Sequence, residues 1–317
     1  MEKHPSQWFV EHHSNYEYHM YACKRVLFIG DTPFQSVQIL ETYDYGKMLI
    51  LDGKVQSAES DEFIYHEALI HPVMMTHPNP RRILIIGGGE GASLREVLRY
   101  SSVEQVTVVD IDKDLIELIR THLEEWHEQS FDDPRVNLIF GDGRKYLENT
   151  QNVYDVIIID ITDILENGPS LTLYTKEFYR LASKRLSHNG LLLVQALELS
   201  CTDYEGHAAI LATLRTIFPT VRSYKVFIPS FWAEWGFLMA SNNLDPVKLD
   251  KKGLQERISK RLVKTQHNDN ELEFYDDETH YALFQIPKNL QNLLSESQMI
   301  IEDNKTIKIH SKEFSLK

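Results

Sequence analysis

Cysteine is scarce in this chain, which has only Cys23 and Cys201, far apart and in no CxxC pair. This argues against a disulfide framework and a structural zinc site and favours a reducing compartment, so we predict a cytoplasmic protein. The sequence also lacks a run of about 18 apolar residues, the length that a membrane span requires. Residues 1–21 carry charges and histidines where a signal peptide would need an apolar core. We therefore expect neither export nor a membrane partner.

Blocks of lysine and arginine are lacking as well. The chain has 33 basic and 47 acidic residues, a formal net charge of −14 and a pI near 5.5. Nucleic acids are bound by clustered basic side chains, so this composition argues against a nucleic-acid partner and fits a cationic or small neutral one. The 42% hydrophobic and 25% charged content is typical of a soluble globular protein with one large core and a smaller unit.

The first part of the chain has the pattern of a small β unit. Residues 35–57 alternate apolar and polar side chains around Tyr-Gly and Asp-Gly turn signals, which predicts a meander of short antiparallel strands. Residues 59–77 then place apolar side chains at helical spacing after an acidic start. Pro78 and Pro80 break the chain. We predict an N-terminal β-meander domain with a linking helix over residues 1–76.

After this break, strand and helix patterns alternate, which predicts an α/β core with a parallel sheet covered on both faces. The strands at 221–228 and 235–240 have no helix between them, so we expect an antiparallel pair at one edge, as in the methyltransferase type of sheet. We assign residues 77–241 to a Rossmann-like nucleoside-binding catalytic domain and 242–317 to a C-terminal extension, with a surface helix, that docks on the core. The other predicted strands are 83–86, 105–109, 136–140, 153–160 and 191–195; helices begin at 91 and 113, lie near 146, and span 175–186 and 205–217.

A glycine-rich turn, IIGGGEGASL, joins the first strand and helix of this core. Gly87, Gly88, Gly89 and Gly91 let the backbone turn sharply and let a ligand approach, although such a turn can also be empty. Asp110 ends the next strand about twenty residues later, where a carboxylate accepts ribose hydroxyls, and this spacing favours a nucleoside site. The turn lacks the Gly-Lys-Ser/Thr ending of a phosphate-cradling loop, which argues against an ATPase.

Two further features of this part suggest the ligand. Glu90 lies inside the glycine turn, where it would repel a pyrophosphate and attract an ammonium, so we expect an adenosine that carries an amine rather than a dinucleotide. Asp142 and Gly143 follow the third strand. They either hydrogen-bond an adenine edge or form a turn that caps the next helix, and their spacing fits both.

Two carboxylates, Asp160 and Asp163, lie at the carboxyl end of the fourth strand, next to the point where open α/β sheets bind ligands. A lone Asp160 could cap a helix or loop, but the second acid favours a functional role. An alkyl amine, with a pKa of roughly 10, is almost fully protonated at pH 7 and needs a base to become a nucleophile. We predict that Asp163 and other acids hold distal ammonium groups while Asp160 takes the proton from the attacking nitrogen.

Six segments in this order resemble the polyamine aminopropyltransferases, the spermidine synthase family: LDGKVQSAESDEFIYHE, HPNPRRILIIGGGEGASLREVL, VVDID, GDGRKYL, DVIIIDITD and LYTKEFY. The resemblance runs from about Gln35 to Ser241. It implies transfer of an aminopropyl group from the co-substrate decarboxylated S-adenosylmethionine to a polyamine, with release of 5′-methylthioadenosine. It also implies no permanently bound cofactor, no metal, and a homodimer or homotetramer.

The resemblance also implies roles for single residues. Asp160 would be the catalytic base, assisted by Tyr65, and Glu90 would bind the amine of the donor. Asp163 and Gln195 would lie on the acceptor side. The residues expected to contact the nucleoside donor are Gln35, Tyr65, His66, Gly87, Gly89, Glu90, Asp110, Asp142 and Gly143.

Two segments depart from the common putrescine-using pattern. Ile164 stands where a proline is usual, and IPSFWAEWGFLMAS replaces Ile-Pro-Thr-Tyr-Pro-Ser-Gly, so Phe231 takes the place of an acceptor-site tyrosine. LYT, IPSF and WGFLMAS are more similar to the branch of thermospermine synthases and thermophile enzymes that act on agmatine or triamines. Phe231, Trp232 and Trp235 would form an aromatic wall for a longer polycation, through cation–π contacts of about 0.5 to 2 kcal/mol each, or would simply pack an edge strand.

Three histidines, His66, His71 and His77, lie near one predicted helix. Their spacing matches neither HExxH nor another common metal pattern. We expect them to serve packing or hydrogen bonding.

Three functions stay open from the sequence. The first is aminopropyl transfer, with putrescine to spermidine as the leading reaction and agmatine, spermidine or another longer polyamine as the alternative acceptor. The second is an ordinary methyltransferase that uses intact S-adenosylmethionine. The third is a catalytically silent nucleoside-binding or scaffold protein, against which Tyr65, Asp160 and Asp163 argue.

Overall fold

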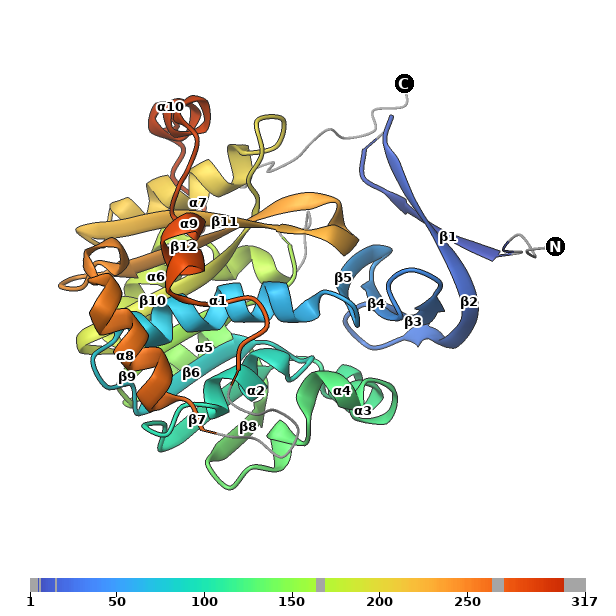
Figure 1. Cartoon of the computed structure of the whole chain (residues 1–317), viewed down its shortest axis with the longest axis horizontal. Coiled ribbons are helices and arrows are strands. Elements are labelled where there is room, and N and C mark those ends of the chain that lie inside the picture. Colours follow the sequence, from blue (N-terminus) through green and yellow to red (C-terminus); the bar gives the residue numbers. More distant parts are fainter. Residues whose placement is uncertain (1–4, 6, 15, 164–168, 264–270, 305–317) are drawn as a thin grey trace.

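The computed structural model describes residues 5, 7–14, 16–163, 169–263 and 271–304, which form two sheets (Figure 1). The smaller is antiparallel, in the order β1-β2-β3-β4-β5, and the larger has seven strands in the order β11-β12-β10-β9-β6-β7-β8. This architecture confirms the predicted fold class. The domain boundaries at 76 and 241 stay a prediction.

The small sheet is larger than the sequence predicted. The expected meander is present as its last three strands, but two strands precede it. Their pattern conceals them, because Glu11 is buried while Val10 and Met20 are exposed, the reverse of the usual alternation. The strands are β1 (Gln7–His12), β2 (Tyr18–Asp31), β3 (Ser36–Thr42), β4 (Lys47–Leu51) and β5 (Lys54–Ala58).

Helix α1 (Glu62–Thr76) leads from the small sheet across the large one (Figure 1). It is buried almost continuously from His66 onward. Pro72 lies inside the helix and has no N–H to donate to the carbonyl of Ala68. The hydroxyl of Tyr224 donates to that carbonyl instead, at 3.0 Å, so the proline leaves no unpaired group there.

In the large sheet, five strands run parallel and the last two form the predicted antiparallel pair at one edge. The central strands are buried on both faces, as their continuous apolar runs indicate. Because the five strands run parallel, their carboxyl ends lie together along one end of the sheet, which is called its carboxyl edge below. The strands are β6 (Arg82–Gly87), β7 (Gln105–Asp110), β8 (Val136–Phe140), β9 (Tyr154–Asp160), β10 (Leu186–Glu198), β11 (Thr220–Ile228) and β12 (Ala233–Ser241).

The remaining helices pack against one of the two sheets or belong to the C-terminal part of the chain, where α8 is the expected surface helix. Within the described residues, none of the helices combines the length and the apolar character needed to cross a membrane. The helices are α2 (Ala92–Leu98), α3 (Lys113–His122), α4 (Glu124–His127), α5 (Gly143–Asn149), α6 (Lys176–Lys184), α7 (Glu205–Arg215), α8 (Lys251–Arg261), α9 (Asp277–Leu283) and α10 (Lys288–Glu296).

Candidate active site

Three of the predicted site residues end neighbouring strands at the carboxyl edge of the large sheet. Gly87 ends β6, Asp110 ends β7 and Asp160 ends β9. In the parallel ladder Gly87 is the register partner of Asp160. The structure thus brings the glycine turn and the two acids together, although they are far apart in the sequence.

The glycine turn is shaped around these two acids. Gly87 and Gly88 have φ values of +82° and +70°, which favour glycine. A Cβ atom on Gly87 would lie 2.1 Å from the carbonyl oxygen of Asp160, and one on Gly89 would lie 2.9 Å from Oδ2 of Asp110. The backbone N–H of Gly88 donates to the same Asp160 carbonyl at 2.7 Å. Close packing of the strand ends therefore requires glycine at these positions, whatever ligand the turn binds.

The carboxylate of Asp160 accepts hydrogen bonds from two hydroxyls. Tyr65 donates to Oδ1 at 2.9 Å, and Ser93 donates to Oδ2 at 2.5 Å. Burial raises the pKa of Tyr65 well above its usual value, and the nearby charge of Asp160 raises it further. The phenol is therefore a neutral donor across the physiological pH range.

Glu90 is an acid of the site with a largely buried side chain. Burial raises its pKa to about 7, although His66 and a hydrogen bond from Ser57 act to lower it. Nε2 of His66 lies 3.9 Å from Oε2 of Glu90. At neutral pH a carboxyl with this pKa is charged in only a fraction of the protein molecules. A bound cation would shift it toward the charged form.

A chain of charges behind Glu90 holds His66 in place. Nδ1 of His66 lies 2.7 Å from Oε2 of Glu62, which in turn accepts from Arg95. Burial alone would lower the pKa of His66, but the hydrogen bond and charge of Glu62 and the charge of Glu90 raise it overall. The imidazole thus lies between two acids, whose charges favour its protonated form.

Gln35 reaches the site through an acid that the sequence had not singled out. Its Nε2 donates to Oδ2 of Asp112 at 2.8 Å, and Asp112 also caps α3 through Leu115. The backbone N–H of Asp112 donates to Oδ1 of Asp110 at 2.8 Å. Burial raises the pKa of Asp110 to about 6. Gln35 and Asp110 are therefore joined by Asp112.

Asp142 caps a helix in the structure. Its Oδ1 accepts from the backbone N–H groups of Arg144 and Lys145, at 2.8 and 3.1 Å, at the start of α5. A Cβ atom on Gly143 would lie 2.4 Å from Cγ2 of Ile86. Both residues thus have the structural roles that the turn alternative describes, and their contact with adenine stays a prediction.

On the expected acceptor side, Gln195 is buried and organises the loop after β9. Its Nε2 donates to the carbonyl of Ile161 at 2.7 Å and lies 3.4 Å from Oδ1 of Asp163. It also donates to the hydroxyl of Tyr174 at 3.0 Å, while Oε1 accepts from the indole of Trp235 at 3.2 Å. The amide therefore ties Asp163 to β12, the strand between β10 and the edge strand β11.

The aromatic residues of the β11–β12 turn divide into two groups. Phe231 lies 5.1 Å from Trp235 and 6.2 Å from Tyr65, measured between ring centres. Trp232 is 59% exposed, and its ring lies 6.1 Å from that of His19 in the small sheet. The structure thus brings Phe231 to Tyr65, with Trp235 packed on Phe231, and places Trp232 beside the small sheet. Ile164 lies outside the described residues.

The histidines that were predicted to serve packing or hydrogen bonding make such contacts. Nδ1 of His71 lies 2.8 Å from the hydroxyl of Tyr100, and its Nε2 lies 3.0 Å from Glu96. In the described part of the chain, one group of side chains has the donor atoms for a metal ion, with these atoms within 4.8 Å of one another: His13, Glu198 and Asp203. None of these is a predicted site residue, and the absence of a functional metal stays a prediction.

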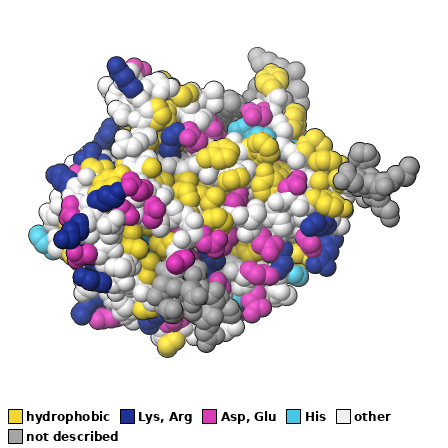
Figure 2. All heavy atoms as spheres, viewed as in Figure 1, with side chains coloured by type: hydrophobic (Ala, Val, Ile, Leu, Met, Phe, Trp, Pro, Cys, Tyr) yellow, Lys and Arg dark blue, Asp and Glu magenta, His cyan; other side chains and the backbone are white. Residues whose placement is uncertain are grey.

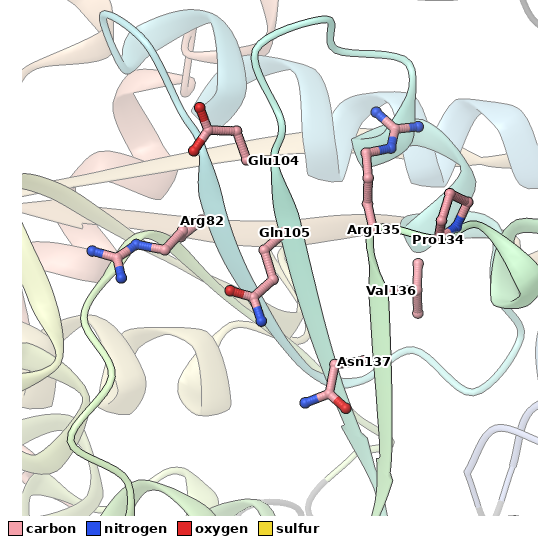
Figure 3. Close-up of a pocket in the computed structure, with 7 residues that line it drawn as sticks. All are labelled: Arg82, Glu104, Gln105, Pro134, Arg135, Val136 and Asn137. Carbon is pink, nitrogen blue, oxygen red and sulfur yellow. The ribbon is translucent and has the colours of Figure 1, made fainter.

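A depression of about 410 Å³ lies at the opposite edge of the large sheet (Figure 3). It is formed where β6, β7 and β8 begin, whereas Asp110 and Asp160 lie at the carboxyl ends of β7 and β9. It is therefore separate from the candidate site. Its lining residues are Arg82, Glu104, Gln105, Pro134, Arg135, Val136 and Asn137.

Several side chains of the site were not among the predicted residues. Glu62 stands one helical turn before His66, a spacing that indicates contact. Ser93 is the second residue after the glycine turn, next to Ala92. Trp126 donates to Ser57 at 2.8 Å from a helix far along the chain, and only the fold brings them together.

The sheet order and the acids around the glycine turn define a nucleoside-dependent transferase with the methyltransferase type of α/β sheet. The chain belongs to the spermine/spermidine synthase family. A family model described as the spermine/spermidine synthase domain matches residues 62–251, and one described as the spermidine synthase tetramerisation domain matches residues 7–59. The chain is therefore an enzyme of the polyamine aminopropyltransferase class, which confirms the resemblance.

Relatives and solved structures support this membership over most of the chain. Polyamine aminopropyltransferase 2 of Pseudomonas aeruginosa is 44% identical over 93% of this chain and 83% of its own length. The polyamine aminopropyltransferase of Sulfolobus acidocaldarius is 43% identical over 92% of this chain and 95% of its own length. A spermidine synthase in complex with the transition-state analogue AdoDATO is 34% identical with a TM-score of 0.83, and covers 92% of this chain and 96% of that one. The spermidine synthase of Thermotoga maritima has a TM-score of 0.81, 32% identity, and coverage of 92% and 95%.

Proposed function

We propose that this enzyme transfers the aminopropyl group of decarboxylated S-adenosylmethionine to putrescine, giving spermidine and 5′-methylthioadenosine. The observation that carries the proposal is that Glu90 lies within the glycine turn against which Asp160 packs. Glu90 binds the ammonium of the donor, and Asp160 lies where a nucleophile would meet the adjacent sulfonium carbon. The donor is a co-substrate, and we propose no permanently bound cofactor.

In this proposal the donor's nucleoside lies along the carboxyl edge of the large sheet. Asp110 accepts the ribose hydroxyls, and the backbone of Gly87 and Gly89 allows the close approach of the nucleoside. The polar groups that complete the donor site are Gln35, through Asp112, together with His66, Asp142 and Gly143.

The transfer is a single displacement. The neutral nitrogen of the acceptor attacks the methylene carbon by which the aminopropyl chain is bound to the sulfonium. The new C–N bond forms, and the electron pair of the broken C–S bond goes to sulfur and leaves a neutral thioether. Asp160 takes the proton of that nitrogen, because an alkyl ammonium has no free pair with which to attack. Tyr65 holds one oxygen of this carboxylate and so orients it.

For the acceptor, we propose Asp163 and Gln195 as contacts of the polyamine chain. Phe231 stands beside Tyr65 and packs against Trp235, so these two rings support a longer polycation, such as agmatine or spermidine, as the alternative acceptor. Trp232 lies farther toward the small sheet, and a contact with acceptor would require a chain that reaches beyond Phe231.

We also propose a homodimer or homotetramer assembled through the small sheet. Figure 2 shows hydrophobic side chains gathered over this part of the molecule. Trp8, Val10, Tyr18 and Met20 are all exposed, and Val10 faces Met20 in the strand register. Exposed apolar side chains in such number indicate a covered surface. The cytoplasmic location stays a prediction.

The proposed reaction is tested by incubating the pure protein with decarboxylated S-adenosylmethionine and, separately, putrescine, agmatine and spermidine. We expect methylthioadenosine with at least one amine, and the fastest release identifies the acceptor. No release with any amine would reject the function. Calorimetry with intact S-adenosylmethionine tests the methyltransferase alternative, because its extra carboxylate would face Glu90 and weaken binding.

A further inference from the structure

Two buried serines each serve one of the two carboxylates of the proposed reaction. Ser57, on β5, donates to Oε2 of Glu90 at 2.7 Å. Ser93, on α2, donates to Oδ2 of Asp160 at 2.5 Å. Hydrogen bonds to a charged acceptor are stronger than those between neutral groups, so both contacts are able to affect the chemistry.

The direction of the Ser57 hydrogen bond follows from its second partner. The indole Nε1 of Trp126 can only donate, and it lies 2.8 Å from Oγ of Ser57. The serine oxygen therefore accepts from Trp126, and its single proton is free for Glu90. A hydroxyl that donates to Glu90 favours the charged form of this carboxyl, against the burial that raises its pKa.

Ser93 completes a pair of donors on Asp160. Tyr65 donates to one carboxylate oxygen from α1, and Ser93 donates to the other from α2. Two donors on different elements fix both the position and the plane of the carboxylate. A base that is held in this way presents the same lone pairs to each attacking nitrogen, which lowers the reorganisation that transfer requires.

We propose that Ser57 and Ser93 are positioning residues with separate tasks: Ser57 holds Glu90 toward the donor's ammonium, and Ser93 holds Asp160 toward the attacking nitrogen. This inference rests on the proposed function of the two acids. It predicts that loss of one serine weakens donor binding and that loss of the other slows transfer.

The test compares Ser57→Ala and Ser93→Ala, with the dissociation constant of decarboxylated S-adenosylmethionine from calorimetry and kcat at saturating donor and amine. For Ser57→Ala we expect a roughly 10-fold weaker donor and a kcat within about 2-fold of wild type. For Ser93→Ala we expect the reverse, a roughly 10-fold lower kcat with donor affinity within about 2-fold. Ser93→Thr, which keeps the hydroxyl, should recover most of the rate.

The matched control is Ser187→Ala. Ser187 donates to Asp155 at 3.0 Å, at the opposite end of β9 from Asp160. The substitution therefore removes a serine–aspartate hydrogen bond that lies away from the site. Neither kcat nor donor affinity should change by more than about 2-fold, the size of effect expected away from the site. Equal effects of all three alanine variants would overturn the inference, since they would indicate a general loss of stability.

Other outcomes also decide the question. Ser93→Ala with full kcat, or Ser57→Ala with unchanged donor affinity, would remove that serine from its task and reject the division. If the wild type binds the donor but releases no methylthioadenosine with any amine, the proposed function fails. The contrast in donor affinity between the two variants then still tests the pairing of Ser57 with Glu90.

Discussion

The hydroxyl of Tyr65 donates to Oδ1 of Asp160 at 2.9 Å and so joins the linking helix to the end of the fourth parallel strand. The two residues are 95 positions apart in the chain. The ring of Tyr65 also packs 5.4 Å from that of Phe237, which fixes the direction of the hydroxyl. Tyr65 and Asp160 are thus held as one unit, with a neutral donor and an acid.

Substitution of this unit should lower turnover in a non-additive way. We expect Asp160→Asn to reduce kcat about 10²-fold or more, the scale of a lost general base, and Tyr65→Phe to reduce it about 10-fold. The double variant should be no slower than Asp160→Asn alone, because Tyr65 acts through the carboxylate. Steady-state rates of methylthioadenosine release measure all three.

Tyr179→Phe is a suitable control for the loss of a buried phenol. In the described part of the chain, the hydroxyl of Tyr179 has no hydrogen-bond partner, so its removal leaves no group unpaired. This variant should keep the wild-type kcat. Additive losses in the double variant would show that Tyr65 acts independently of Asp160.

Donor binding should depend on pH through Glu90. Burial raises the pKa of this carboxyl to about 7, so it is charged above that pH and neutral below it. Because only the charged form attracts the donor's ammonium, we expect the dissociation constant to rise roughly 10-fold from pH 8 to pH 6. Calorimetry should also show proton release on binding near pH 6, as the ammonium restores the charge.

Glu90→Gln isolates this effect. The amide does not titrate, so the variant should bind the donor weakly at pH 8 and lose most of the pH dependence. Asp110, whose pKa burial raises to about 6, and His66, whose pKa is raised by Glu62 and Glu90, are the groups that would give a dependence below pH 7. An unchanged pH profile in Glu90→Gln would assign the titration to another group.

The sequence was sufficient for the large sheet and for the ends of its strands. Runs such as Val156–Ile159 are apolar throughout because both faces are covered, and the polar residue that ends each run marks the ligand edge. Gly87, Asp110 and Asp160 were therefore located from pattern alone. The resemblance added Tyr65 and His66, which precede the core and have no local sign of their target.

Contacts that depend on tertiary packing were not accessible in the same way. The pairing of Trp126 with Ser57 joins α4 to the small sheet, and no periodicity relates these positions. Glu11 and Met20 reverse the usual alternation of the small sheet, which hid two of its strands. Whether such a residue is buried or exposed depends on which part of the fold packs over it. A single sequence does not show that packing.

The C-terminal segment should stabilise the helix that carries Tyr65. Glu67 is buried on α1, and its carboxylate accepts from the backbone N–H groups of residues 273, 274 and 275, at 2.9, 2.9 and 2.7 Å. Glu67→Ala leaves these donors unpaired, so we expect a loss of about 3 kcal/mol in the free energy of unfolding. Urea denaturation followed by circular dichroism measures the change.

Arg144→Ala is the control for this prediction. Arg144 also binds the C-terminal segment, through Asp303 at 2.6 Å, but it does so on α5 and near the surface. Partly exposed ion pairs contribute little, so the loss should stay below about 1 kcal/mol. Similar losses of unfolding free energy in both variants would mean that Glu67 contributes no more to stability than the surface ion pair of Arg144.

The exposed face of the small sheet should determine the oligomer. Val10 and Met20 are register partners on neighbouring strands and are 39% and 57% exposed, so two lysines there would place charge in the centre of a covered surface. Burying an unpaired charge costs more than an apolar contact provides. We expect Val10→Lys with Met20→Lys to lower the particle mass in light scattering at equal concentration. Val247→Lys, at an exposed position outside the small sheet, should leave the mass unchanged. An unaltered mass in the double variant would move the interface to another face.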